Sequence, residues 1–307
     1  MIPRRWWAAV ASLLAALALA SCTPYALAQP PRDPLIRTTQ VAGATLAYCA
    51  STPIEEWGAG VRRVIVGVHG LDRNACGMRR AIVDALGGEP ADTVVVAPHF
   101  ATAVDAFAGG HAWAAMTWPE GAEATTGASS YAVLDALVAQ FGGRSVTLVG
   151  FSGGGQFTNR YAAVSPVDLD SYVVINPSSY VWFTAERPGP TRDCPAWDAW
   201  RYGLDDRSGY ASRLDEAAIT AQYGRRSVRY LIGTADDDPH SPSLDRSCGA
   251  MAQGTHRLDR AFAYQRHLHA VFGPGIVARQ PVIVVPGVGH DGGAMLASTA
   301  GRRALGG

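Results

Sequence analysis

The sequence contains no lysine. All 26 residues in the combined lysine and arginine count are arginine, and they balance 26 aspartate and glutamate residues, so the formal net charge is zero. Without lysine, the chain has neither a lysine nucleophile nor an amine that could form a Schiff base. Without net charge, it has no overall attraction to nucleic acid or acidic lipid. We therefore expect no nucleic-acid partner.

Repeats, low-complexity segments and closely spaced cysteine pairs are also missing. No segment recurs at a fixed period, which argues against a repeat architecture. No C-x-x-C pair occurs, which argues against a structural zinc site. We expect one large α/β domain, with no metal ion and no organic cofactor.

The N-terminal residues are typical of an export signal. Arg4 and Arg5 precede an apolar run over residues 6–20 that is too short and too rich in alanine for a membrane span. We predict a signal peptide over residues 1–28 and a Pro-rich linker over 29–40. The protein is then exported to the periplasm or the extracellular space.

Two cleavage sites compete at the end of this signal. Residues 19–22 resemble a bacterial lipobox, in which Cys22 becomes lipidated and tethers the protein to a membrane, whereas residues 26–28 form an ordinary A-x-A site. We favour the lipobox because it directly follows the apolar run. In the alternative, Cys22 is removed with the signal.

The remaining four cysteines also favour an oxidising compartment. Four cysteines allow three pairings. We predict Cys49–Cys76 and Cys194–Cys248, which join neighbours in the sequence. A metal site is the alternative use of these thiols.

Short apolar runs alternate with segments of helical spacing, a pattern typical of a mostly parallel sheet flanked by helices. Strands are predicted at 41–49, 63–68, 93–97, 145–150, 171–175, 227–232 and 281–285. Helices are predicted at 78–86, 129–141, 154–164, 258–272 and 293–305. The stretch over about 177–226 breaks this alternation, and its tryptophans and prolines indicate an insertion over one edge of the sheet.

The strongest motif is the pentapeptide G-x-S-x-G at residues 150–154, centred on Ser152. A strand is predicted before it and a helix after it, which is the context that this motif requires. A serine on such a turn projects its hydroxyl group away from the backbone, where it can act as a nucleophile. In the alternative, the glycines only tighten packing.

A serine needs a base, and in this arrangement the base follows the last strand. His290 lies in a Gly-rich loop directly after the strand predicted at 281–285. The acid that orients this base is expected between the two residues in sequence. Asp236 follows the strand predicted at 227–232, although its neighbours Asp237 and Asp238 stay open. A solvated acidic loop, or a weak calcium site with Asp245, is the alternative use of these carboxylates.

The backbone amides of Leu71 and Gly153 are the candidates for an oxyanion hole. Leu71 follows the early strand at 63–68, and Gly153 follows the serine. His69 precedes Leu71, and we expect it to make structural hydrogen bonds.

Taken in order, the segments HGL at 69–71, GFSGG at 150–154, GTAD at 233–236 and GHD at 289–291 resemble the α/β-hydrolase superfamily. Within it, the chain resembles secreted bacterial serine esterases and polyester depolymerases. The resemblance implies a hydrolase domain over 41–307, with Ser152 as nucleophile, His290 as general base and Asp236 as orienting acid. The missing HGGG-type loop departs from the hormone-sensitive-lipase-like branch, and the Trp-rich insertion departs from minimal cutinase-like forms.

These residues predict hydrolysis of a carboxylic ester, small or polymeric, through an acyl-enzyme. Trp118, Tyr180 and Trp182 are candidates for binding the substrate, with packing of the insertion as the alternative. Two other functions stay open. One is a peptidase, amidase or acyltransferase on the same fold, and the other is a non-catalytic surface-binding lipoprotein.

Overall fold

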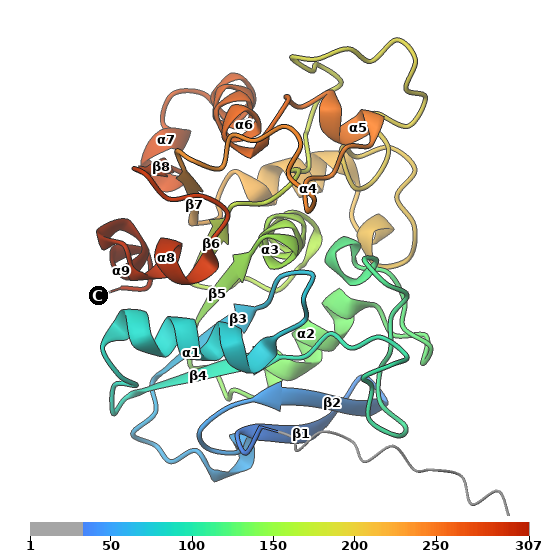
Figure 1. Ribbon diagram of the computed structural model, residues 1–307. Coiled ribbons are helices and arrows are strands. Elements are labelled where there is room, and N and C mark those ends of the chain that lie inside the picture. Colours follow the sequence, from blue (N-terminus) through green and yellow to red (C-terminus); the bar gives the residue numbers. More distant parts are fainter. Residues whose placement is uncertain (1–32, 307) are drawn as a thin grey trace, which may run out of the picture. The chain divides into compact units, whose positions relative to one another are not determined.

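Eight strands form one sheet in the order β1-β2-β4-β3-β5-β6-β7-β8 (Figure 1). The computed structural model describes residues 33–306, so the predicted signal peptide and Cys22 lie outside the described residues. The strands are β1 Ile36–Val41, β2 Ala44–Cys49, β3 Arg63–Val68, β4 Thr93–Pro98, β5 Ser145–Phe151, β6 Ser171–Ile175, β7 Val228–Gly233 and β8 Val282–Val285. β1 and β2 are antiparallel to their neighbours, and the six strands from β3 to β8 are parallel.

Helices cover both faces of this sheet. They are α1 Ala75–Leu86, α2 Ser130–Ala139, α3 Gly153–Val164, α4 Glu216–Tyr223, α5 Cys248–Met251, α6 Arg257–Phe272, α7 Ile276–Arg279, α8 Gly292–Ala297 and α9 Thr299–Ala304. Alternate strand residues point to opposite faces. Ile65 accordingly packs with side chains from α1, α8 and α9. Val64 and Val66 instead join the larger core under α2, α3, α4 and α6.

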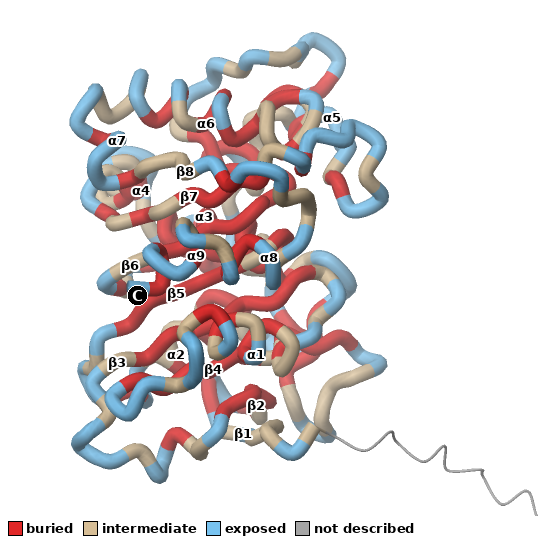
Figure 2. The backbone as a smooth tube through the Cα atoms, turned by 60° about the vertical axis from the view of Figure 1, so that its left-hand side comes forward, coloured by how far each residue is buried: buried red, intermediate tan, exposed pale blue. Residues whose placement is uncertain are grey.

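Burial follows the parallel strands β3 to β7, in which most residues are buried, whereas the edge strand β8 is only partly buried (Figure 2). Strands covered on both faces need apolar side chains at successive positions, which explains the unbroken Val/Ile/Leu runs in the sequence. The carboxyl ends of these strands meet at one edge of the sheet, and the loops that follow them can bring distant residues together.

The N-terminal strands correct two predictions. The single strand predicted over 41–49 is a hairpin, and its turn places Ala42 at φ 47° and Gly43 at φ 83°. Positive φ at both central residues gives a turn whose twist matches that of the paired strands. The linker predicted over 29–40 is wrong from residue 36 onward, because β1 pairs along its whole length with β2. The prolines before this segment obscured its β-branched residues.

The Trp-rich insertion over 177–226 is partly regular. Its last part forms α4, which leads directly into β7, so the irregular segment is shorter than predicted. Trp182 is buried and stacks on His267 of α6 at a centroid distance of 4.2 Å. The terminal helix predicted over 293–305 is two short helices, because Ser298 is extended and caps the second.

Both predicted disulfides, Cys49–Cys76 and Cys194–Cys248, are confirmed. They close loops of 27 and 54 residues, and the second fastens the insertion to α5. Disulfides form in oxidising compartments, which indicates an extracytoplasmic location. Over residues 33–306, none of the helices combines the length and the apolar character needed to cross a membrane.

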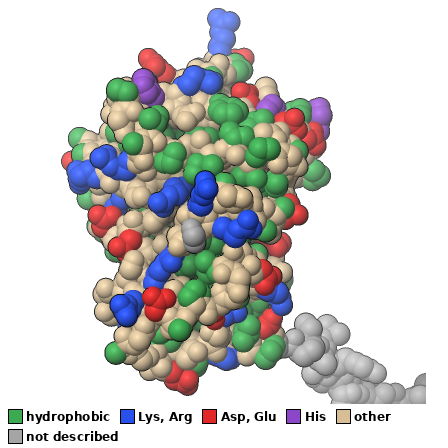
Figure 3. Space-filling view, turned by 90° about the vertical axis from the view of Figure 1, so that its left-hand side faces the viewer, with side chains coloured by type: hydrophobic (Ala, Val, Ile, Leu, Met, Phe, Trp, Pro, Cys, Tyr) green, Lys and Arg blue, Asp and Glu red, His purple; other side chains and the backbone are tan. Residues whose placement is uncertain are grey.

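The surface over α1, α8 and α9 carries arginine and acidic side chains interspersed with apolar ones (Figure 3). Mixed charges on this face agree with the zero net charge of the whole chain.

His267 joins the insertion to α6 and should make the fold sensitive to acid. Its Nε2 accepts a hydrogen bond from the Phe183 N–H at 3.0 Å. Burial, and to a lesser extent the charge of Arg187, lowers the pKa of His267 to about 3. In the unfolded chain a histidine takes up its proton near pH 6.5, so below that pH the unfolded state binds more protons and the free energy of unfolding falls.

We predict that His267→Gln, which does not titrate, weakens this acid sensitivity. Between pH 7 and pH 4.5, its free energy of unfolding should fall by about 2–3 kcal/mol less than that of the wild type in urea denaturation. The exposed His240 offers a control, His240→Gln. An identical loss of stability in the His267 variant and the wild type would contradict the prediction.

Candidate active site

Ser152 lies on the tight turn between β5 and α3, with φ 56° and ψ −115°. A residue with a side chain rarely adopts positive φ, and such strain persists only where the surrounding structure enforces it. The turn is held in place because the Ser152 N–H donates to the Ile175 carbonyl oxygen at 2.9 Å, and the Ser152 carbonyl accepts from the Gln156 N–H at 3.0 Å.

The two outer glycines of the motif make this turn possible. A Cβ at Gly150 would overlap the carbonyl group of Gly154, and a Cβ at Gly154 would overlap the carbonyl group of Val68. α3 can therefore approach β5 and β3 only because both positions lack a side chain. The G-x-S-x-G pattern has a steric cause in this chain.

His290 lies between Ser152 and Asp236. Its Nε2 is 2.9 Å from Ser152 Oγ, and its Nδ1 is 2.7 Å from Asp236 Oδ2. Three parallel strands supply these residues, since Ser152 follows β5, Asp236 follows β7, and His290 lies in the loop after β8. The structure thus brings together three side chains that are far apart in the sequence.

Asp236 is buried, and two further side chains bind its carboxylate. Asn176 Nδ2 donates to Asp236 Oδ2 at 2.8 Å and to the Gly289 carbonyl oxygen at 3.1 Å, which ties the acid to the histidine loop. Arg257 Nη1 donates to the other oxygen, Oδ1, at 3.2 Å. The Arg257 side chain is fully buried, so this is an ion pair away from solvent.

The neighbouring carboxylates lie elsewhere. Asp237 and Asp238 are both exposed, and Asp238 accepts a hydrogen bond from the His240 N–H at 2.8 Å. Of the three consecutive aspartates, Asp236 is the one whose carboxylate reaches His290.

Two backbone amides lie beside Ser152 at the predicted positions. Gly153 is the first residue of α3, where a backbone N–H has no acceptor within the helix. A Cβ at Gly153 would lie 3.4 Å from the Leu71 nitrogen, so the Gly153 and Leu71 amides are close neighbours. Donors in this position can stabilise negative charge on an oxygen atom bound next to Ser152 Oγ.

His69 holds the loop that carries Leu71. Its Nδ1 donates to the Gly70 carbonyl oxygen at 2.8 Å, and its Nε2 accepts from the Phe100 N–H at 3.1 Å. An acceptor nitrogen cannot carry a proton, so the ring is neutral. Burial lowers the pKa of His69 to about 3, in agreement with this arrangement. The histidine therefore fixes the loop and is not available as a second base.

A cavity of about 490 Å³ opens beside Ser152. Its lining residues are Leu71, Met116, Ser152, Gly153, Gln156, Ser178, Arg201, Pro242, Ser243, Leu244, Asp245 and Arg246. A second cavity, of about 630 Å³, runs along β8, α8 and α9, but no histidine, carboxylate or thiol is among its lining residues. The cavity at Ser152 is therefore the candidate for substrate binding.

The three aromatic residues predicted to bind substrate are packed inside the protein. Trp118 stacks on Phe100 at 5.2 Å, and Tyr180 stacks on Tyr264 at 4.3 Å. Trp118 and Tyr180 are each 1% exposed, Trp182 is 4% exposed, and none of the three lines the cavity. The packing alternative therefore describes them, because an aromatic ring with so little exposure offers no face to a ligand.

Comparison with known proteins identifies the architecture. No protein-family model matches the chain, and a search of curated proteins gives no match. Poly(aspartic acid) hydrolase-1 from Sphingomonas sp. KT-1 superposes with a TM-score of 0.63 and 22% identity, over 86% of this chain and 96% of that one. LpqC, a poly(3-hydroxybutyrate) depolymerase from Bordetella parapertussis, superposes with a TM-score of 0.64 and 23% identity, over 86% and 85%. The chain has the α/β-hydrolase fold.

Two residues of this site were not predicted from the sequence. Asn176 directly follows β6 and adopts φ 45°, and Arg257 begins α6. A polar residue at the end of an apolar strand was a usable signal for Asn176. No sequence pattern indicated that Arg257 belongs to the site, because only the packing of α6 against the loop after β7 brings it to Asp236.

We predict that Arg257 positions Asp236 and weakens its attraction for a protonated His290. The other groups facing this carboxylate are Asn176 and, at longer range, the hydroxyl of Tyr180, whose pKa burial raises. In Arg257→Gln, removal of the cation should let Asp236 stabilise the protonated imidazole more strongly. The acid limb of the pH profile of kcat/KM should then move up by about one pH unit.

Arg257→Lys is the matched control for this prediction, since it keeps the positive charge. The acid limb of the Arg257→Lys variant should lie close to the wild-type position, even if this variant is less stable than the wild type. A loss of stability in Arg257→Gln with an unmoved acid limb would show that the ion pair serves only the fold.

Proposed function

We propose that this protein is a serine hydrolase that cleaves carboxylic esters through an acyl-enzyme. One observation carries the proposal, namely the hydrogen-bonded line from Ser152 Oγ through His290 to Asp236. A serine hydroxyl is a weak nucleophile until an adjacent base takes its proton, and this line supplies the base and its orienting acid.

In the acylation step, Ser152 Oγ attacks the ester carbonyl while His290 Nε2 accepts the hydroxyl proton. Asp236 accepts a hydrogen bond from His290 Nδ1–H, which leaves Nε2 unprotonated and ready to act as the base. The Leu71 and Gly153 amides stabilise the oxyanion of the tetrahedral intermediate. When the C–O bond breaks, His290 returns the proton to the leaving alcohol.

In the deacylation step, water replaces the alcohol. His290 removes a proton from the water, its oxygen attacks the acyl carbonyl, and the proton passes to Ser152 Oγ as the acid leaves. The atoms balance as one ester and one water giving one alcohol and one acid. Every proton transfer passes through His290 Nε2.

Ester and amide cleavage use the same groups, and the two structural neighbours point to both. The Bordetella neighbour is named for a polyester and the Sphingomonas neighbour for poly(aspartic acid). We place esters first, because alkoxides leave more readily than amines, and amides second. Polymeric as well as small esters are included in the proposal. Turnover of a matched ester and amide distinguishes the two reactions.

We also propose that the protein acts outside the cytoplasm, where lipidation of Cys22 would tether it to a membrane. The disulfides support the compartment. Mass spectrometry of the mature N-terminus distinguishes a lipidated Cys22 from cleavage after Ala28.

Ser152→Ala tests the reaction directly. The variant should lower kcat for short-chain 4-nitrophenyl esters by about 10⁴-fold or more, because the nucleophile is lost while the cavity stays intact. Circular dichroism and the melting temperature should match those of the wild type.

Ser212→Ala, which truncates an exposed serine, is the control and should keep full activity. Retained turnover in Ser152→Ala would refute the assignment. A wild-type protein that binds esters without hydrolysing them would favour a non-catalytic surface-binding lipoprotein.

A further inference from the structure

Several hydrogen-bond donors line the cavity beside Ser152, and we refer to this part of its lining as the donor wall. Gln156, Arg201 and Arg246 line this wall, together with a single carboxylate, that of Asp245. Four apolar residues also line the cavity, namely Leu71, Met116, Pro242 and Leu244. A ligand that fills the cavity therefore meets both apolar and cationic side chains.

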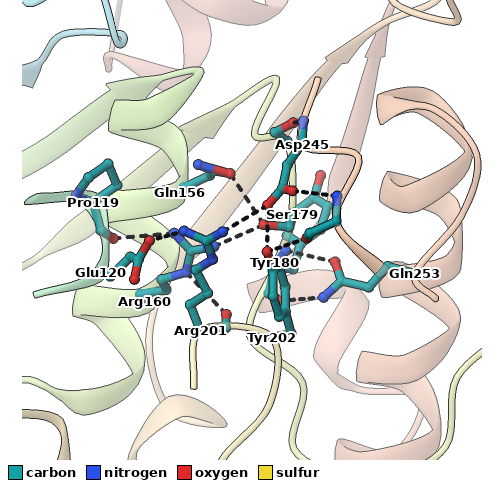
Figure 4. Close-up of polar contacts among 12 residues, drawn as sticks. Pro119, Glu120, Gln156, Arg160, Ser179, Tyr180, Arg201, Tyr202, Asp245 and Gln253 are labelled. Carbon is teal, nitrogen blue, oxygen red and sulfur yellow. Dashed lines mark hydrogen bonds and ion pairs between the residues drawn. The ribbon is translucent and has the colours of Figure 1, made fainter. Parts of the chain in front are cut away.

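Asp245 carries a negative charge that partly offsets the guanidinium groups, but its oxygens are already engaged by donors of the protein. Oδ1 accepts from the Ser247 N–H at 3.0 Å, and Oδ2 accepts from the Tyr202 hydroxyl at 2.7 Å and lies 3.5 Å from Arg201 Nη2 (Figure 4). Burial alone would raise the pKa of Asp245, but the hydrogen bonds from Ser247 and Tyr202 and the charge of Arg201 lower it. The carboxylate is thus ionised and accepts bonds from the protein.

Gln156 is held with its donor end free. Ser179 Oγ donates to Gln156 Oε1 at 3.2 Å, and the buried Arg160 donates through Nη2 to Ser179 Oγ at 2.9 Å. Figure 4 shows the oxygen of Gln156 turned toward Ser179 and its nitrogen turned away. The amide nitrogen is therefore the atom that Gln156 can offer to a ligand.

Arg246 supplies the most available charge on this wall. Its side chain is exposed, and within residues 33–306 its guanidinium group has no ion-pair partner. Arg201, in contrast, pairs with Glu120 as well as Asp245. Arg246 can therefore bind an incoming anion without breaking an existing ion pair.

Buried arginines add positive charge behind the wall. Arg160 and Arg260 are almost completely buried, and both donate to backbone carbonyl oxygens, those of Pro119 and Ser178 among them. Burial lowers the pKa of Arg260 to about 10, so it stays cationic at neutral pH. Among the residues that line the cavity itself, two arginines, Arg201 and Arg246, accompany one carboxylate, Asp245. A local excess of one charge in a cleft attracts ligands of the opposite sign.

We propose that the substrate is an ester that also bears a carboxylate, bound by Arg246 with Arg201 and Gln156. The apolar residues contact the chain that joins this carboxylate to the ester. Arg246 is thus a specificity-determining residue. This inference rests on the proposed ester hydrolysis at Ser152, and it adds the chemical class of the substrate.

Two matched pairs of esters test the inference, with the charge on either side of the ester bond. Monoethyl adipate is compared with the ethyl ester of adipic monoamide, and 4-acetoxybutanoate with 4-acetoxybutanamide. Within each pair a carboxylate replaces a carboxamide of nearly equal size. Acid release at constant pH gives kcat/KM for all four compounds.

We expect the carboxylate to be preferred by about tenfold or more in at least one pair, the effect of one charge-assisted hydrogen bond. Arg246→Gln should bring this preference close to one, and Arg246→Glu should reverse it. Raising the salt concentration to 1 M should reduce the wild-type preference, because salt screens exposed charges. Arg192→Gln removes an exposed arginine that does not line the cavity, and it should keep the preference.

Equal or weaker turnover of the carboxylate in both pairs would overturn the inference, as would a preference that survives in Arg246→Gln and Arg246→Glu. Hydrolysis of the neutral esters in that case would leave the proposed function intact. If no ester is hydrolysed, the proposed function fails and this inference fails with it.

Discussion

The close approach of α3 to β5 and β3 is the constraint on which the site depends. Two glycines permit that approach, and the strained backbone of Ser152 results from it. The strain has a chemical consequence, since the hydroxyl group then lies within hydrogen-bond distance of an imidazole 138 residues away in sequence. Parallel strands make such a meeting possible, because their carboxyl ends share one edge of the sheet.

Arginine defines the electrostatics around this site. A chain without lysine has to place its cations as guanidinium groups, which remain charged when buried and bind several acceptors at once. Arg257 binds the buried Asp236 carboxylate, while Arg160 and Arg260 fix the segment after β6 through its serines and carbonyl groups. Two further arginines, Arg201 and Arg246, line the cavity beside Ser152.

The sequence was sufficient to predict the six parallel strands, the two disulfides and the order in the chain of the serine, acid and histidine that the structure brings together. Apolar runs mark buried parallel strands, and residues at strand ends mark the site, so Asp236 and His290 could be found without coordinates. The hairpin at Ala42 and Gly43 was missed because the apolar residues begin at Val41, and the polar residues of β1 before it were assigned to a linker. Asn176, Arg257 and the donor wall were missed because they depend on how α6 and the insertion pack. The same packing explains why Trp118 and Tyr180 lie in the core.

Labelling with an alkyl fluorophosphonate, followed by mass spectrometry of the peptides, tests the central claim most directly. The reagent reacts with a serine only where a neighbouring base activates it, so it reports on the Ser152–His290 contact without requiring knowledge of the substrate. The account predicts a single adduct on Ser152 of the folded protein that disappears when His290 is replaced by alanine. A folded protein that stays unlabelled, or that carries the adduct on another residue, would contradict it.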